Sequence, residues 1–205
     1  MKKPVVIFVT ILMLCSIAGC GKKQEEAQTA GGWALTNDVS VTAEAQGAFD
    51  KALEGLTGVG YTPVALLGTQ LVSGTNYSFL CEAAVVYPDA QPYYALVYVY
   101  ENLEGDAEVL NIVPLNIGDI AESGEIKAAE TGSEQLLGGW TVDRETSVEA
   151  DDAVMHLATQ IVAGKNHCVL CKGWTLAFIY EDLDGKTEVT QSVPLDIAAL
   201  SQPAE

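Results

Sequence analysis

Gln70-Leu71-Val72-Ser73-Gly74 and Gln160-Ile161-Val162-Ala163-Gly164 share the pattern Gln-x-Val-x-Gly, and this pair of motifs decides how the chain is organised. Each motif lies inside a longer repeated block that continues with an asparagine and then an apolar stretch ending in a cysteine. Stretches rich in β-branched and aromatic residues on both sides of a glycine-containing turn are typical of a β-hairpin. The chain therefore contains an internal duplication, and each copy carries the motif on a predicted hairpin turn.

The duplication extends outward from the motifs in both directions. Gly31-Gly32-Trp33 matches Gly138-Gly139-Trp140, and residues 100–105 match residues 180–185. The offset between the copies is 90 residues at the motifs and 80 residues at the later match. Repeat two is therefore shorter than repeat one before its motif, and shorter again after Cys171.

Residue patterns in repeat one predict a helix followed by four antiparallel strands. Apolar residues recur at helical spacing from Ala45 to Leu56, and Gly58 favours the end of this helix. The stretches that are rich in β-branched and aromatic residues and bounded by turn residues are 62–72, 75–87, 93–100 and 108–117. With a short strand at 33–41, these patterns predict the α+β class, in which an antiparallel sheet wraps one helix.

Repeat two fits the same pattern less completely. Thr146-Ser147-Val148-Glu149 matches a capping box at the start of a helix, whereas residues 153–159 align with residues 63–69, which are predicted strand. Residues 148–158 are therefore predicted as either a short helix or a strand. In both cases one face of the second sheet lacks a full helix, and an apolar face has to be buried. We expect repeat two to pack against repeat one or to self-associate with another copy.

The first twenty residues predict export and anchoring. Lys2 and Lys3 precede an apolar stretch at 5–13, and Ile17-Ala18-Gly19-Cys20 resembles the lipobox of bacterial lipoproteins. The resemblance implies cleavage before Cys20 and lipidation of its thiol, so the protein is expected outside the cytoplasm, tethered to the bacterial cell membrane. The predicted units are a signal peptide (1–19), a lipidated tether (20–30), a first domain (31–118), a linker (119–137) and a shortened second repeat (138–199).

Net charge excludes one large class of partner. After Gly19 the chain holds eight basic residues and 28 acidic ones, a net charge of −20. Such a surface repels phosphates, so nucleic-acid binding is not expected. Acidity otherwise reports solubility rather than fold, and most acidic clusters are expected to be solvated.

No residue pattern predicts catalysis, a metal or a cofactor. Cys168-Val169-Leu170-Cys171 matches Cys-x-x-Cys, but residues three apart on a strand point to opposite faces, which disfavours metal binding and thiol exchange. For the same reason His167 is expected to point away from Cys168, which disfavours a Cys–His nucleophile. The acidic turns at 101–108 and 181–188 lack the regular ligand spacing of a calcium loop. We expect a non-enzymatic protein.

Gln-x-Val-x-Gly, followed in repeat one by Thr75-Asn76-Tyr77 and an apolar strand, resembles the cystatin family. In that family the motif lies on the first hairpin loop and enters the active-site cleft of papain-like cysteine proteases. The resemblance implies a cystatin-like fold, duplicated here with a truncated second copy. It also implies inhibition by occlusion, without covalent chemistry.

The resemblance assigns protease contact to the two motifs and to the two diglycines, since the family uses a glycine-hinged N-terminal segment as a second contact. The residues so assigned are Gly31, Gly32, Gln70, Leu71, Val72, Ser73, Gly74, Gly138, Gly139, Gln160, Ile161, Val162, Ala163 and Gly164. The chain departs from the family in its last hairpin turns, which usually present Pro-Trp. Here these turns are acidic and contain no tryptophan.

Two functional hypotheses remain open on the sequence. The first is a surface-anchored, reversible inhibitor of papain-family cysteine proteases. The second is a non-enzymatic envelope lipoprotein whose domains form a protein-binding or assembly module with another envelope protein. The paired motifs and diglycines favour the first hypothesis, and the missing Pro-Trp favours the second. Under a purely structural interpretation, Gln-x-Val-x-Gly closes a tight hairpin.

Overall fold

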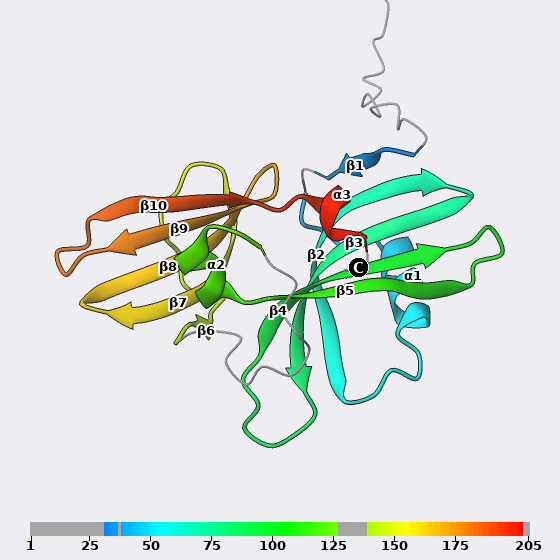
Figure 1. Cartoon of the computed structure of the whole chain (residues 1–205), viewed down its shortest axis with the longest axis horizontal. Coiled ribbons are helices and arrows are strands. Elements are labelled where there is room, and N and C mark those ends of the chain that lie inside the picture. Colours follow the sequence, from blue (N-terminus) through cyan, green and yellow to red (C-terminus); the bar gives the residue numbers. More distant parts are fainter. Residues whose placement is uncertain (1–30, 37, 127–138, 203–205) are drawn as a thin grey trace, which may run out of the picture.

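Two five-stranded antiparallel sheets make up most of the protein in a computed structural model, which describes residues 31–36, 38–126 and 139–202 (Figure 1). The first sheet has the order β1-β2-β3-β4-β5, with β1 (Trp33–Leu35), β2 (Val59–Val72), β3 (Gly74–Val85), β4 (Tyr93–Glu101) and β5 (Ala107–Leu115). The second has the order β10-β9-β8-β7-β6, with β6 (Thr141–Val142), β7 (Ala153–Val162), β8 (Gly164–Cys171), β9 (Thr175–Glu181) and β10 (Thr187–Pro194). The four long strands of repeat one lie where the residue patterns predicted them.

Helix α1 (Ala43–Ala52) covers one face of the first sheet. Its N-cap residue Thr42 accepts a hydrogen bond from the backbone N–H of Ala45, which is the ordinary way to satisfy a first-turn donor. Phe49 of α1 meets Phe79 of the sheet edge to face, with ring centroids 5.0 Å apart. The helix ends earlier than the expected stop near Gly58, because the chain turns after Leu53 and Gly55 adopts a positive φ.

The expected fold class was wrong. We expected a duplicated α+β, cystatin-like fold, but the molecule is mainly β, and α1 is the only helix of more than seven residues among those that the structure describes. Within the described ranges, no helix covers the second sheet at the position that α1 occupies on the first. The other two helices, α2 (Ile117–Ser123) and α3 (Ile197–Leu200), are short and follow the last strand of each repeat.

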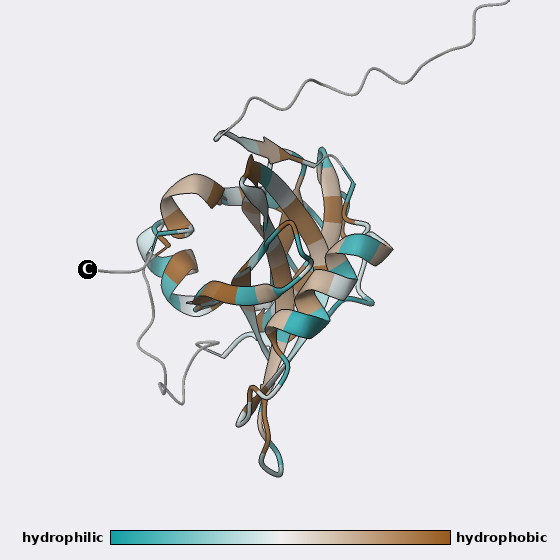
Figure 2. Ribbon diagram, turned by 90° about the vertical axis from the view of Figure 1, so that its right-hand side faces the viewer, coloured by the Kyte–Doolittle hydropathy of each residue, from teal (hydrophilic) through white to brown (hydrophobic). Residues whose placement is uncertain are grey.

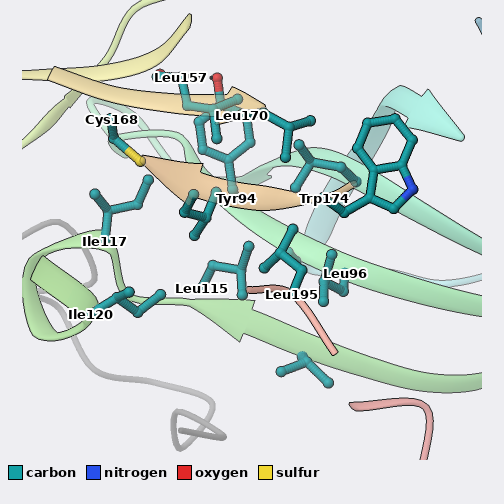
Figure 3. Packing of buried hydrophobic residues seen from close by; sticks show 14 of the residues in the cluster. Tyr94, Leu96, Leu115, Ile117, Ile120, Leu157, Cys168, Leu170, Trp174 and Leu195 are labelled. Atoms are coloured by element: carbon teal, nitrogen blue, oxygen red, sulfur yellow. Dashed lines mark hydrogen bonds between the residues drawn. The ribbon is translucent and has the colours of Figure 1, made fainter. Parts of the chain in front are cut away.

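The two sheets pack together through equivalent faces. Leu67, Leu80, Tyr94 and Leu96 of the first sheet share one buried cluster with their counterparts in the second sheet, which are Leu157, Leu170, Trp174 and Leu176 (Figure 3). The Tyr94 hydroxyl donates to the Leu157 carbonyl (3.1 Å), and the Trp174 indole N–H donates to the Leu67 carbonyl. The two donors, Tyr94 and Trp174, are repeat equivalents of each other, and so are the two acceptors, Leu157 and Leu67. The contact therefore has approximate two-fold symmetry.

The short helices are exchanged between the repeats. Residues of α2, including Ala121 and Glu122, line a small pocket with Trp140 and Phe178 of repeat two, and Ile117 lies near Cys168 (Figure 3). In return, the carbonyl of Ile197 in α3 accepts a hydrogen bond from the Tyr98 hydroxyl (3.1 Å). Helix α2, with buried Ile117 and Ile120, therefore includes the start of the segment 119–137 that was predicted as a polar linker.

Of residues 148–158, which were predicted as either helix or strand, those from Ala153 onward belong to strand β7, and none is helical. The vacated helix face of the second sheet is covered by residues 143–150, which we call the strap. Val148 and Ala150 of the strap pack against Val169, Cys171, Ala177 and Ile179. The Thr146 hydroxyl donates to the Asp143 carboxylate rather than capping a helix. We expected the face without a helix to pack on repeat one. Instead the strap covers that face, and the opposite face of the second sheet packs on repeat one.

The two repeats also differ at the turn after their third strand. In repeat one β3 and β4 are joined by a longer loop, and Val86 and Tyr87 there are exposed. The strand ends that lead into this loop are brown at the lower edge of Figure 2. In repeat two β8 and β9 are separated by only three residues and are themselves shorter than β3 and β4, and the shorter loop and shorter strands together account for the change in offset after Cys171. Among the residues that the structure describes, no helix has the length and apolar character of a membrane span.

Candidate functional site: two pairs of hairpin tips

The first Gln-x-Val-x-Gly motif forms the tip of the β2–β3 hairpin. Leu71, Val72 and Ser73 are exposed there. The β4–β5 turn lies beside this tip, because the Tyr100 hydroxyl donates to the Ser73 carbonyl (2.6 Å). Leu103 projects from that neighbouring turn with 80% of its surface exposed. We call Leu71, Val72, Ser73 and Leu103 the first end.

Repeat two builds the same arrangement. Ile161, Val162 and Ala163 are exposed at the β7–β8 tip, and the Tyr180 hydroxyl donates to the Ala163 carbonyl (2.5 Å). Leu183 in the β9–β10 turn is 85% exposed. We call Ile161, Val162, Ala163 and Leu183 the second end. The two ends lie on opposite sides of the molecule (Figure 1).

Gly74 and Gly164 are required by a neighbouring strand. Their φ angles are 129° and 120°, in a region that side chains rarely adopt. A Cβ atom on Gly74 would lie 2.3 Å from the Glu101 carbonyl oxygen, and one on Gly164 would lie 2.3 Å from that of Glu181. The glycines thus let the first hairpin of each repeat press against the end of the next strand.

Gln70 holds the entering chain against the tip. Its side-chain Nε2 donates to the Gly31 carbonyl (2.9 Å), and its Oε1 accepts from Asn76 Nδ2 (2.7 Å). The Gly31 N–H also donates to the Leu71 carbonyl (3.0 Å). The structure therefore brings Gly31 to the first end and uses Gln70 as an internal clamp.

The clamp is partly repeated in the second copy. Gln160 Oε1 accepts from Asn166 Nδ2 (2.7 Å), as Gln70 Oε1 does from Asn76. Gly139, the counterpart of Gly32, adopts a φ of 81°, whereas in repeat one the positive φ of 84° belongs to Gly31. Gly138 lies outside the described residues, as does the predicted lipidation site Cys20. Gly32 is exposed beside Gly31. Of the assigned residues, Leu71, Val72, Ser73, Ile161, Val162 and Ala163 present the exposed surface of the tips.

The second turn of each end is held rigid by a side-chain acceptor. Asn102 Oδ1 accepts from the backbone N–H groups of Glu104 and Asp106, and Asp182 Oδ1 accepts in the same way from Asp184 and Lys186. In repeat one, Lys51 of α1 adds a bond to the Gly105 carbonyl (2.7 Å). These bonds fix the turns that carry Leu103 and Leu183.

Sequence reasoning missed Leu103 and Leu183. Both turns were described by their acidic residues, and the leucine between them was not considered as contact surface. The available signal was the shared pattern, Asn102-Leu103-Glu104-Gly105 and Asp182-Leu183-Asp184-Gly185, with an aliphatic residue at a position expected to be solvated.

The buried cysteines lie on different surfaces, as strand alternation predicted. Cys168 belongs to the cluster between the repeats, whereas Cys171 lies under the strap. Burial raises the pKa of the Cys81 and Cys168 thiols far above the ordinary value, and a thiol is a poor nucleophile until it ionises. Among the described residues, no cluster of histidine, cysteine and carboxylate side chains has the arrangement of a metal site.

Comparison with known proteins gave no match to a protein-family model, to a curated protein or to a solved structure. The geometry of the two ends is therefore the basis for a functional proposal.

Proposed function

We propose that this chain is a lipid-anchored, extracytoplasmic inhibitor of papain-family cysteine proteases, which acts by inserting a hairpin end into the substrate cleft. The observation that carries the proposal is the composition of each end. Two adjacent tips, one with the Gln-x-Val-x-Gly motif and one with an exposed leucine, present three aliphatic side chains on a fixed frame.

Rigid tips favour tight reversible binding. The entropy lost on association is smaller when the contact surface is already ordered, and the tyrosine and Asx-type bonds order both tips before any partner arrives. Transfer of aliphatic side chains from water into a cleft contributes about 25 cal/mol per Å² of apolar surface buried. Leu103 and Leu183 supply an apolar contact at the turns where the cystatin family has tryptophan.

The proposed lipid anchor would place the two ends at different distances from the membrane. The chain enters the first sheet at Gly31, beside the first end. Ten residues separate Gly31 from Cys20, and ten extended residues reach roughly 35 Å at most. A lipid on Cys20 would therefore keep the first end near the membrane and leave the second end facing outward.

A second candidate function is an envelope assembly module that bridges two partners. The observation that favours it is the internal use of the motif: Gln70 bonds Gly31 and Asn76, and Gly74 packs on Glu101. A hairpin that needs these residues for its own structure would keep the motif without any protease. Two ends on opposite sides would suit a bridge between two proteins.

The test is a titration of papain and a cathepsin-like protease with residues 21–205, following residual activity. Stoichiometric, reversible inhibition is expected, and the number of enzymes bound per chain shows whether both ends act. Val72→Asp with Leu103→Asp should weaken inhibition by the first end at least tenfold, about 1.4 kcal/mol. Val162→Asp with Leu183→Asp should do the same for the second end.

Val86→Asp is the matched control, because Val86 is 78% exposed and lies in the β3–β4 loop, outside both ends. It should leave inhibition unchanged. Absence of inhibition by the unaltered protein at high micromolar concentration would reject the inhibitor proposal. Cross-linking to envelope proteins from either end, and its loss in the same variants, would then support the assembly module.

A further inference from the structure

The only two histidines of the chain lie side by side inside repeat two. His156 on β7 is 7% exposed and His167 on β8 is fully buried. His156 Nδ1 faces the Asp143 carbonyl (2.5 Å), His156 Nε2 faces His167 Nδ1 (3.1 Å), and His167 Nε2 faces Glu181 Oε2 (3.0 Å). The four residues form one continuous chain of hydrogen bonds from the strap to the end of β9.

This chain of hydrogen bonds takes the place of an apolar contact in repeat one. The position of His156 corresponds to Leu66, and that of His167 corresponds to Tyr77. Leu66 and Tyr77 lie on the face that α1 covers, and the Tyr77 hydroxyl donates to Glu101 (3.2 Å). Repeat two keeps the carboxylate, as Glu181, but pairs it with a titratable ring beneath the strap instead of a helix.

The geometry fixes the number of protons in the chain. The Asp143 carbonyl only accepts, so His156 must donate from Nδ1, and its neutral ring then accepts at Nε2. Burial lowers the pKa of His156 and so favours its neutral ring, and His167 then donates from Nδ1 to His156. Its Nε2 is left facing a carboxylate oxygen, and that contact is a hydrogen bond only if one further proton lies between them. All three bonds are made when two otherwise neutral rings and one carboxylate share a single proton.

Removing the shared proton, or adding a second one, breaks this chain of hydrogen bonds. Without the shared proton, a lone pair of His167 and the Glu181 carboxylate face each other at 3.0 Å. With an additional proton on His156, two N–H groups point at each other across 3.1 Å. An unsatisfied polar group at a buried site costs much more than the same group in water, so neither state is compatible with the observed packing.

The remaining charged groups around the chain do not replace the shared proton. Lys165 Nζ on β8 lies 3.8 Å from Glu181 Oε1, the oxygen that His167 does not use. The Asp143 carboxylate in the strap accepts from Thr146 and Thr159 and not from either histidine. The Cys171 thiol, whose pKa is raised by burial, lies on the same face. Glu181 is partly exposed, which gives protons a route to solvent.

We propose that the Asp143–His156–His167–Glu181 chain is a pH-sensitive latch, which holds the strap on the second sheet while it contains one shared proton and releases the strap when that proton is lost or a second is gained. Repeat one has no such latch, because Leu66 and Tyr77 occupy the corresponding positions. Release also loosens the end of β9, where Glu181 packs against Gly164. A consequence for binding at the second end rests on the proposed function, whereas the latch itself does not.

The test follows amide hydrogen exchange of Glu145 and Thr146, whose N–H groups bond Asp143, across about pH 5–9 after correction for intrinsic rates. In residues 21–205 we expect protection to be highest in the middle of the range and to fall at least tenfold on each side. Nitrogen NMR should show His156 protonated at Nδ1 only, and His167 protonated at Nδ1 and sharing its second proton with Glu181.

Two variants separate the latch from general pH sensitivity. Glu181→Gln offers His167 Nε2 an amide donor, so two neutral rings satisfy the chain without a shared proton. This variant should lose the alkaline release and keep the acidic one. His156→Leu with His167→Tyr copies repeat one and should lose both. An alkaline limb that is identical in the wild type and in Glu181→Gln would overturn the proposal, as would two histidines that titrate independently; the NMR result stands even if the double variant fails to fold.

Discussion

At the scale of single residues, position 74 requires glycine because of the neighbouring backbone as well as its own φ angle. Any side chain there would need a φ near 129° and would meet the Glu101 carbonyl oxygen at 2.3 Å. Gly47 in α1 provides the opposite case, because its φ is ordinary and nothing lies within 4 Å of a Cβ atom built on it. The two glycines therefore differ in the reason for their presence.

Gly74→Ala should lower the free energy of unfolding by about 2 kcal/mol or more, because backbone strain and a steric clash add. Gly47→Ala should raise it by about 0.5–1 kcal/mol, the usual gain in a helix interior. Urea denaturation of both variants measures the difference. Equal effects at the two positions would show that the close approach to Glu101 is not what requires Gly74.

At the scale of elements, Asp143 organises the strap. Its carboxylate accepts from the Thr146 hydroxyl (2.5 Å), the Thr159 hydroxyl (3.0 Å) and two strap N–H groups. Burial alone would raise the pKa of Asp143, but the hydrogen bonds from Thr146, Thr159 and Glu145 outweigh burial and lower it to about 2. A depressed carboxyl pKa contributes stability above its unfolded value, and this stability is lost as the pH falls toward 2.

Asp143→Ala should destabilise the protein by about 1–3 kcal/mol, because it leaves several donors without an acceptor. Asp143→Asn keeps one acceptor oxygen and should cost less.

In the unaltered protein, acidification should weaken the strap in two stages. Burial lowers the pKa of His156, so the stability that its neutral ring contributes is lost first, as the pH falls below about 6.5. The stability that the Asp143 carboxylate contributes is lost second, as the pH falls below about 4. Thermal midpoints measured against pH for the three proteins check both points, and an Asp143→Ala profile that parallels the wild type in strong acid would contradict the second.

At the scale of the whole molecule, the repeats are joined by contacts that neither could satisfy alone. Tyr94 and Trp174, which occupy equivalent positions, each donate a hydrogen bond across the interface, and their rings are almost fully buried. Burial raises the pKa of the Tyr94 phenol well above its ordinary value, so the hydroxyl remains a donor. The exchange of α2 and α3 adds to the same interface, so we expect the repeats to unfold as one unit.

Tyr94→Phe removes one interface hydroxyl and should lower stability by about 0.5–1.5 kcal/mol. Tyr87→Phe, at an exposed position of the β3–β4 loop, should stay within about 0.5 kcal/mol of the wild type. Hydrogen exchange of amides in β3 and in β8 reports each repeat separately. Under Tyr94→Phe both should lose the same protection, and a loss confined to β3 would mean that the repeats unfold independently.

Sequence patterns alone were enough to predict the duplication, the four long strands of repeat one, the place of α1 and the opposite orientation of Cys168 and Cys171. These features follow from local periodicity, which is written in neighbouring residues. It located the motif tips as well, although it left Leu103 and Leu183 unrecognised because a leucine among acidic residues has no local pattern that marks it as part of a contact surface.

The fold of repeat two and the arrangement of the molecule depend instead on tertiary contacts. Residues 148–158 carry both a helical and a strand pattern, and strand pairing of β7 with β8 selected the strand. The exchange of α2 and α3, the contacts of His167 with His156 and Glu181, and the approach of Glu101 to Gly74 join residues that are not neighbours in the sequence. Such contacts depend on which apolar faces bury one another, and that choice is made by the whole chain at once.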